Sequence, residues 1–189
     1  MDVRKFLDIM SVAEQLKNNT RHSWTSSNRH ESVAEHSWRL SLMAYLVKDE
    51  FPDADINKVI LMCICHDLGE AFTGDIPAFN KTKSDEIKEN REIHQWINNL
   101  PEPYKGELTE LFREMNELKT LESRIFKALD KMEALIQHNE ADISSWLPLE
   151  YELNLTYGEK EVEFSEYMKD LRAAINEDTI NKIKSSKTQ

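Results

Sequence analysis

The sequence predicts an all-α protein, and two observations carry that prediction. Apolar residues recur with the helical period along nearly the whole of the 189-residue chain. The chain has only 4 glycines and 5 prolines, which disfavours a turn-rich β-sandwich or a disordered chain. We find no internal repeat, low-complexity block or linker, so we expect a single domain over residues 1–189, with residues 185–189 frayed.

Two helices are predicted in the first part of the chain. An apolar stripe over residues 3–16 favours the first helix, and a polar stretch over residues 18–28 interrupts the pattern. Ser32 and Glu35 have the spacing of a capping box, which predicts the start of the second helix. On that helix His36 shares a face with apolar residues, so we expect a histidine on its inward side.

A third, largely apolar helix follows. Residues 56–68 are apolar almost all the way round, which is typical of a helix buried on several sides, and Gly69 is placed to end it. A loop leads to a polar helix over about residues 84–99, which Pro101 stops. Residues 104–118 then predict another helix.

The remaining chain predicts two long helices with an ambiguous segment between them. Apolar stripes over residues 121–136 and 164–175 mark the helices, and Asp130 lies at the margin of the first stripe. Between them, apolar residues alternate over residues 147–157, which by itself indicates a strand. A proline and a glycine flank this segment in positions that suit a short helix, and no second candidate strand exists to pair with it, so we favour a helix there.

Composition limits the ligands and the location. The formal net charge is -11 and the pI is about 5.1, which argues against a polynucleotide or an anionic membrane surface, because both require an extended basic face. Residues 15–30 contain no acidic residue, so a small anion is still allowed. The longest apolar run, residues 59–65, is too short to span a membrane, and Asp8 lies where a signal peptide is apolar, so we expect a cytoplasmic protein.

Cys63 and Cys65 point to different sides of one helix, which predicts buried thiols rather than a disulfide or a thiolate metal site.

The residues with the clearest chemistry are His36, the pair His66-Asp67 and Asp130, each on a different predicted helix. Two imidazoles and two carboxylates form a mixed nitrogen and oxygen donor set, which suits a divalent ion such as Mn, Fe, Co, Zn or Mg. His66-Asp67 also ends an apolar run, where an ionisable pair is costly to bury without a ligand or a partner. From the residues alone, an interpretation without a metal has equal weight: helix caps and backbone groups satisfy the histidine and the aspartate.

The pattern resembles the HD superfamily of metal-dependent phosphohydrolases. In particular, Glu31-Ser-Val-Ala-Glu-His-Ser and His66-Asp-Leu-Gly-Glu-Ala-Phe-Thr-Gly-Asp-Ile-Pro look like the bacterial 5′-deoxynucleotidases and the HD-domain-containing-2 type proteins. The similarity covers about residues 21–142. It implies an all-α HD-domain fold in which four residues bind one divalent metal ion: His36, His66, Asp67 and Asp130.

The resemblance also implies the residues that act on a substrate. Glu70 and Asp75 match the family's catalytic pair, in which Glu70 could hold or deprotonate the water that the metal activates and Asp75 could protonate the leaving 5′ oxygen. Without the resemblance, Glu70 would be a solvated residue after a helix end and Asp75 a turn residue. The implied substrate contacts are Arg21, Trp24, Asp67, Asp75, Pro77 and Lys81.

These contacts differ in how well they suit a phosphorylated ligand. Arg21 has the fork that matches two phosphate oxygens, and the Trp24 indole suits a sugar or a base. A core position for Trp24 and a solvated loop position for Lys81 are the alternatives. Related triphosphohydrolases and cyclic-nucleotide phosphodiesterases have further histidines near the site, but His94 and His138 do not match those patterns, so we expect them to be helix-surface or core histidines.

The sequence therefore predicts an enzyme that hydrolyses the 5′ phosphate of a (deoxy)ribonucleoside monophosphate with one divalent metal ion. Three alternatives stay open: action on another small phosphomonoester or phosphodiester, a non-catalytic metal- or nucleotide-binding HD module, and a purely structural helical protein. Ala71 after Glu70 disfavours the guanosine tetraphosphate hydrolases, which have an acidic pair there. The resemblance also predicts a homodimer, and the apolar residues around 146–157 could form its interface or cover the protein's own core.

Overall fold

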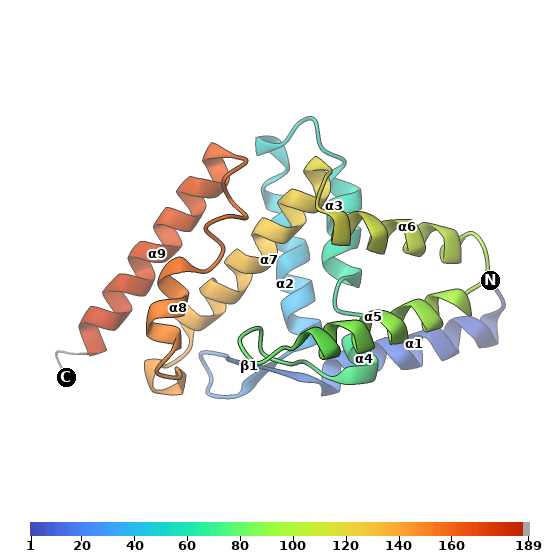
Figure 1. The fold of residues 1–189 in the computed structure, drawn as a ribbon, viewed down its shortest axis with the longest axis horizontal. Coiled ribbons are helices and arrows are strands. Elements are labelled where there is room, and N and C mark those ends of the chain that lie inside the picture. Colours follow the sequence, from blue (N-terminus) through green and yellow to red (C-terminus); the bar gives the residue numbers. More distant parts are fainter. Residues whose placement is uncertain (187–189) are drawn as a thin grey trace.

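The computed structural model describes residues 1–186, and its architecture is helical, as predicted (Figure 1). A small antiparallel sheet of two strands lies between the first two long helices. The elements, in chain order, are α1 (Val3–Asn18), β1 (Thr20–Trp24), β2 (His30–Ser32), α2 (Val33–Leu46), the 3-10 turn η1 (Lys48–Glu50), α3 (Ile56–Cys65), α4 (Glu70–Thr73), α5 (Lys83–Asn98), α6 (Tyr104–Glu117), α7 (Leu121–Glu140), the 3-10 turn η2 (Ile143–Ser145), α8 (Glu150–Thr156) and α9 (Glu166–Ser186).

Helix α7 is the centre of the fold. It packs against α2, α3 and α9, and its apolar face includes Ile125, Leu129 and Met132, all of which are fully buried. Figure 1 shows α7 running between α2 and α3 on one side and α8 and α9 on the other. Because side chains three or four residues apart share a helix face, this one helix can carry functional groups to several parts of a site.

Side-chain caps determine where the helices that carry the site begin. Ser32 and Glu35 form the predicted capping box at the start of α2, where the Glu35 carboxylate accepts the Ser32 backbone N–H at 2.8 Å. At the start of α7 the Thr120 hydroxyl accepts the Ser123 N–H at 3.2 Å. Each cap satisfies a backbone N–H that the first helical turn leaves without a partner.

The polar stretch after the first helix forms a hairpin that the sequence analysis did not predict. Thr20 pairs with Ser32 and Trp24 pairs with His30. Four steps along β1 therefore match two steps along β2, so β1 carries two extra residues between the paired positions. Such a bulge turns side chains away from strict alternation. As a result, three consecutive residues of β1 line the same cavity, which is described below.

The third helix is shorter than predicted. α3 ends at Cys65, and Gly69 has helical dihedrals, with φ of -60°, and leads into α4, so the predicted helix end at Gly69 is wrong. A Cβ on Gly69 would lie 2.8 Å from Glu89 Cγ, so this glycine permits the close approach of α5. α3 is also less enclosed than predicted, since Leu61 and Ile64 are exposed.

The ambiguous segment 147–157 contains a short helix, as we favoured. α8 occupies most of it, and Gly158 follows with a positive φ of 76°, a conformation that glycine adopts without strain. Arg172 on α9 donates to two backbone carbonyls at the C-terminal end of α8, at 2.6 and 3.0 Å. These hydrogen bonds satisfy carbonyls that the end of a helix leaves unpaired.

The other predictions about the ends and the core have mixed outcomes. α9 continues to Ser186, so residues 185 and 186 are helical, and residues 187–189 of the end that we expect to fray lie outside the described part. Trp146 is buried, so the apolar segment that it begins covers the protein's own core at that point. Cys63 and Cys65 are buried free thiols, as predicted. None of the described helices is long and apolar enough to cross a membrane.

Candidate functional site

The four predicted metal ligands come together from three segments of the chain. His36 lies in the first turns of α2, His66 and Asp67 follow α3, and Asp130 lies in the middle of α7. The Nε2 atom of His36 is 3.4 Å from Asp130 Oδ1 and 3.9 Å from Asp67 Oδ2. The Nε2 atom of His66 is 3.0 Å from Asp67 Oδ2 and 3.8 Å from Asp130 Oδ1. The four donor atoms therefore surround one small volume.

The two histidines are oriented as metal ligands are. Nδ1 of His66 donates to the Cys63 carbonyl at 2.9 Å, and Nδ1 of His36 contacts the Glu133 carboxylate. Each ring thus turns its Nε2 atom towards the shared volume. His66 Nε2 is buried and forms no hydrogen bond with the residues that the structure describes, although Asp67 Oδ2 lies 3.0 Å from it. An imidazole held through Nδ1, with Nε2 facing carboxylates, is the arrangement that binds divalent ions, so the residues fit a metal ion.

The charges around these ligands also suit a cation. Although burial raises the pKa of the Asp130 carboxyl, Lys127 at 2.9 Å and the hydrogen bond with His36 hold that pKa well below its usual range. Burial likewise opposes ionisation of Asp67, but the two histidines keep its pKa low. Burial and Arg21 lower the pKa of His36, and Asp130 and the neighbouring glutamate outweigh them and raise it to about 9. A metal ion must therefore displace a proton from His36.

Glu133 is fully buried, one turn after Asp130, and joins three cationic groups. Its carboxylate contacts His36 Nδ1, accepts from Arg39 Nε at 2.7 Å and accepts from Arg21 Nη1 at 3.2 Å. Burial raises the pKa of Glu133, but His36 and the two arginines bring it down to about 2. An ionised Glu133 thus orients a metal ligand and Arg21 together. The sequence analysis missed it, although its three-residue spacing from Asp130 was a signal.

Glu70 and Asp75, the predicted catalytic pair, line the same cavity as His36, Asp67 and Asp130. Glu70 begins α4 and is 5% exposed, and its Oε2 atom has no hydrogen-bond partner within residues 1–186, so it is not the solvated residue of the alternative interpretation. Burial raises the pKa of Glu70 to about 10, with further contributions from Asp67, Asp75 and Glu89. Burial also raises the pKa of Asp75, which accepts a hydrogen bond from the backbone N–H of His22. Both carboxyls therefore hold a proton more readily than a solvated carboxyl.

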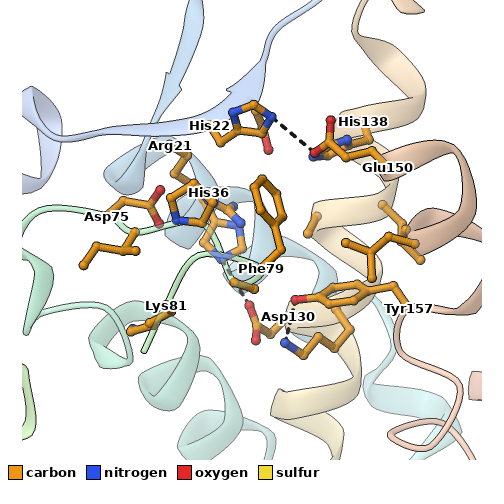
Figure 2. Close-up of a pocket in the computed structure, with 18 of the residues that line it drawn as sticks. Arg21, His22, His36, Asp75, Phe79, Lys81, Asp130, His138, Glu150 and Tyr157 are labelled. Atoms are coloured by element: carbon orange, nitrogen blue, oxygen red, sulfur yellow. Dashed lines mark hydrogen bonds and ion pairs between the residues drawn. The ribbon is translucent and has the colours of Figure 1, made fainter. Parts of the chain in front are cut away.

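A cavity of about 330 Å³ opens beside these groups, and we call it the site cavity (Figure 2). Lys81 lies in its wall with Nζ 2.6 Å from Glu89 Oε2, so its charge is paired within the site. Further cations surround the site cavity, although the whole protein is acidic, and an anionic ligand suits them. The predicted substrate contacts that line it are Arg21, Asp67, Asp75, Pro77 and Lys81, and two unpredicted lysines join them, Lys127 and Lys131.

Trp24 does not take the position that the resemblance implied. Among the described residues, those that line the site cavity include His22 but not Trp24. The Trp24 indole packs against His30 in a tilted arrangement, with ring centroids 4.0 Å apart, and the Trp24 backbone carbonyl accepts from Gln137 Nε2 at 2.7 Å. The physical reason is the bulge in β1, which lets both Arg21 and His22 face the cavity.

Two further residues of the site cavity were not predicted. His138 lines it, whereas we expected a helix-surface or core histidine. Glu150 is buried beside it, with Oε1 3.2 Å from His22 Nε2 and 3.7 Å from His138 Nε2. His138 lies eight residues after Asp130 on α7, so helical periodicity was a signal for it. Glu150 had no comparable signal, because only tertiary packing brings α8 to this place.

The fold and the His-Asp centre define a class of protein. The family model of the HD domain matches residues 13–172, and the chain belongs to the HD domain family. A predicted metal-dependent phosphohydrolase from Magnetospirillum magnetotacticum MS-1 has the same fold, with a TM-score of 0.79, 22% identity and coverage of 94% of this chain and 92% of that chain. A conserved hypothetical protein from Pyrococcus furiosus superposes with a TM-score of 0.69 and 31% identity, over 91% of this chain and 98% of that chain.

Within this family the chain is similar to curated 5′-deoxynucleotidases. The human 5′-deoxynucleotidase HDDC2 is 33% identical over 141 residues, which are 72% of this chain and 68% of that protein. The protein of the same name from Dictyostelium discoideum is 29% identical over 145 residues, 71% of this chain and 76% of that protein. The 5′-deoxynucleotidase YBR242W from Saccharomyces cerevisiae is 30% identical over 140 residues, 69% of this chain and 58% of that protein. The family resemblance read from the sequence is therefore confirmed.

Proposed function

We propose that the chain is a metal-dependent enzyme that removes the 5′ phosphate of (deoxy)ribonucleoside monophosphates. One observation carries this proposal: the ligand atoms of His36, His66, Asp67 and Asp130 converge beside a cavity lined by Arg21. A phosphate bound there would meet a divalent ion and an arginine fork together. The similarity to proteins named 5′-deoxynucleotidase supports a nucleotide as the substrate.

The four ligands would hold one divalent ion, and a mixed nitrogen and oxygen donor set suits Mn, Co, Mg, Zn or Fe. When bound, such an ion polarises a phosphoryl oxygen and makes water more acidic. The protein keeps the ligands in place through the Cys63 carbonyl behind His66 and through Glu133 behind His36. Such outer contacts set the orientation and basicity of the imidazoles.

Arg21 and Lys81 bind the phosphate in this proposal. Arg21 Nη1 donates to Glu31 at 3.3 Å and to Glu133 at 3.2 Å, which positions the guanidinium and leaves its other N–H groups for phosphate oxygens. Lys81 exchanges its ion pair with Glu89 for the phosphate. Asp67 and Pro77 belong to the same wall of the site cavity and complete the contacts.

Glu70 and Asp75 move the protons of the reaction. A bond forms between phosphorus and the oxygen of the attacking water while the bond from phosphorus to the 5′ oxygen breaks. In the metal-free protein Glu70 holds a proton, but the positive charge of a divalent ion at the neighbouring ligands would favour its ionised form, in which it would accept a proton from that water. Asp75, whose pKa burial raises, gives a proton to the leaving 5′ oxygen. The products are inorganic phosphate and the nucleoside.

A substrate panel tests the proposal. Chelator-stripped protein is supplied with Mn, Co, Mg, Zn or Fe and with each nucleoside and deoxynucleoside monophosphate. We expect phosphate release with at least one metal, and we expect Glu70→Gln and Asp75→Asn to lower kcat by about 10²- to 10⁴-fold while metal binding is kept. Glu152→Gln, on the exposed side of α8, is the control and should match the wild type.

Two results would contradict this assignment. Near-wild-type turnover by both variants, with the metal site intact, would exclude this catalytic pair. Metal binding without phosphate release from any phosphomonoester would favour the non-catalytic HD module.

We also propose that the chain is a single HD domain, which the match over residues 13–172 supports. We propose that it resides in the cytoplasm, which the free buried cysteines support.

A homodimer is the proposed assembly. Its candidate interface is the face of α2 whose apolar side chains are exposed: Trp38, Leu42, Tyr45 and Leu46. Sedimentation should show a dimer for the wild type and a monomer for Leu46→Glu, and a monomeric wild type would contradict the proposal.

A further inference from the structure

One end of the site cavity holds a charged cluster that the proposed phosphate chemistry does not use. Glu150 Oε1 lies 3.2 Å from His22 Nε2 and 3.7 Å from His138 Nε2. These three residues, which we call the His–Glu cluster, come from α8, β1 and α7. Figure 2 shows them together on one side of Phe79, with Asp130 on the other side. The cluster and Asp130 therefore occupy different ends of one cavity.

The His–Glu cluster is both firmly held and open to the cavity. The Glu150 side chain is 2% exposed, and its Oε2 atom accepts the Leu147 backbone N–H at 2.7 Å. Oε1 is the oxygen that faces the two imidazoles, whose side chains are 24% and 14% exposed. Burial lowers the pKa of His138, which favours the neutral imidazole. Its Nδ1 atom accepts from Asn154 Nδ2 at 3.4 Å, so Nε2, on the side of Glu150, carries the proton and is the donor. A fixed acceptor and two imidazoles are thus available to a ligand in the cavity.

The spacing between the two ends suits a nucleotide. His138 is eight residues after Asp130 on α7, which corresponds to about 12 Å along the helix axis. The phosphate and the base of one nucleotide are separated by a distance of this size. A nucleotide whose phosphate lies near Asp130 therefore places its base near His138. Phe79 lies between the two ends, with its ring centroid 5.6 Å from that of His22 in a T-shaped contact. An aromatic face at this position offers a surface to a sugar or a base.

We propose that the His–Glu cluster is a base-recognition subsite that favours bases with an exocyclic amino group, such as adenine and cytosine, over thymine and uracil. Glu150 Oε1 accepts a hydrogen bond from the exocyclic amino group of the base, as carboxylates do when they read cytosine. An imidazole N–H of His22 or His138 donates to the ring nitrogen next to that amino group. Thymine and uracil present a carbonyl oxygen to the carboxylate instead and are disfavoured. This inference rests on the proposed nucleotidase function.

The test compares bases on a common sugar phosphate. For the wild type we expect kcat/KM for the monophosphates of deoxyadenosine and deoxycytidine to exceed that for thymidine by about tenfold, the value of one hydrogen bond to a charged group. In Glu150→Gln the amide oxygen can keep the bond to the Leu147 N–H, and the amide N–H₂ then faces the base. The preference should therefore fall to about one or reverse. Glu152→Gln on the same helix is the matched control.

A structural role for Glu150 gives a different result. It would change kcat/KM for every substrate, including base-free deoxyribose 5-phosphate, by one common factor, and that outcome would overturn the inference. So would a wild type that does not discriminate among the bases. If the wild type releases phosphate from no substrate, the proposed function fails, and binding of unphosphorylated deoxyadenosine and thymidine by calorimetry still tests the subsite. Equal affinities in the wild type would then overturn the inference.

Discussion

Replacing Glu70 by glutamine should stabilise the metal-free protein and remove part of its pH dependence. Glu70 is 5% exposed, and burial, together with Asp67, Asp75 and Glu89, raises its pKa from 4.5 to about 10. In the unfolded chain the carboxyl returns to its ordinary pKa of about 4.5. Between these two values the folded protein holds a proton that the unfolded chain has lost.

The size of the effect follows from that single proton. Because the folded state binds more protons, the free energy of unfolding falls as pH rises, by up to about 1.4 kcal/mol per pH unit. From about pH 5.5 to about pH 8 the wild type therefore loses about 3 kcal/mol through this carboxyl. Glutamine has no proton to lose, so Glu70→Gln lacks this contribution, while the other titrating groups act equally on both proteins.

Urea unfolding of the two chelator-treated proteins at both pH values measures the difference. We expect the stability of Glu70→Gln, relative to the wild type, to grow between the lower and the higher pH by about 3 kcal/mol. Glu152→Gln, at an exposed position, should give no such growth. A difference that stays constant between the two pH values would show that Glu70 is already ionised in the folded protein, and the reasoning from its burial would be refuted.

Three further predictions concern the ligands and the phosphate contact. Metal affinity, measured by titration into stripped protein, should rise with pH up to about 9, because a proton on His36 competes with the metal, and a flat profile would contradict this. Glu133→Gln should weaken metal binding by about 10- to 100-fold, since it holds His36, and an unchanged affinity would remove it from that role. Arg21→Ala should raise KM for nucleotides without weakening the binding of the bare nucleoside, and an equal loss for both would contradict a phosphate contact.

The metal ligands could be predicted because each lies on a strongly periodic segment. His36 follows a capping box, the pair His66-Asp67 ends an apolar run, and Asp130 borders an apolar stripe. Periodicity places such residues on the inward face of a helix, and helices that share a core bring their inward faces together. The family resemblance supplied the remaining step, which is that these three faces meet at one point.

Other parts of the site depend on contacts that no local pattern encodes. The hairpin was missed because its strands are short and polar, and β2 has only three residues. Its bulge decides that His22, and not Trp24, faces the cavity, and a bulge exists only relative to the strand that it pairs with. Tertiary structure therefore decides that the aromatic residue at the cavity is His22 and not Trp24, which lies two positions later.

Helix α7 shows where sequence reasoning could have gone further. Asp130, Ala134 and His138 are four residues apart, and all three line the site cavity. At about 100° per residue, the residues four and eight positions after Asp130 are turned from it by about 40° and about 80°, so all three lie on one broad side of the helix. Once Asp130 is taken as a ligand, His138 is therefore a candidate cavity residue. The ion pair that gives it a partner was not, because Glu150 reaches the cavity only through the packing of α8 against the end of α7.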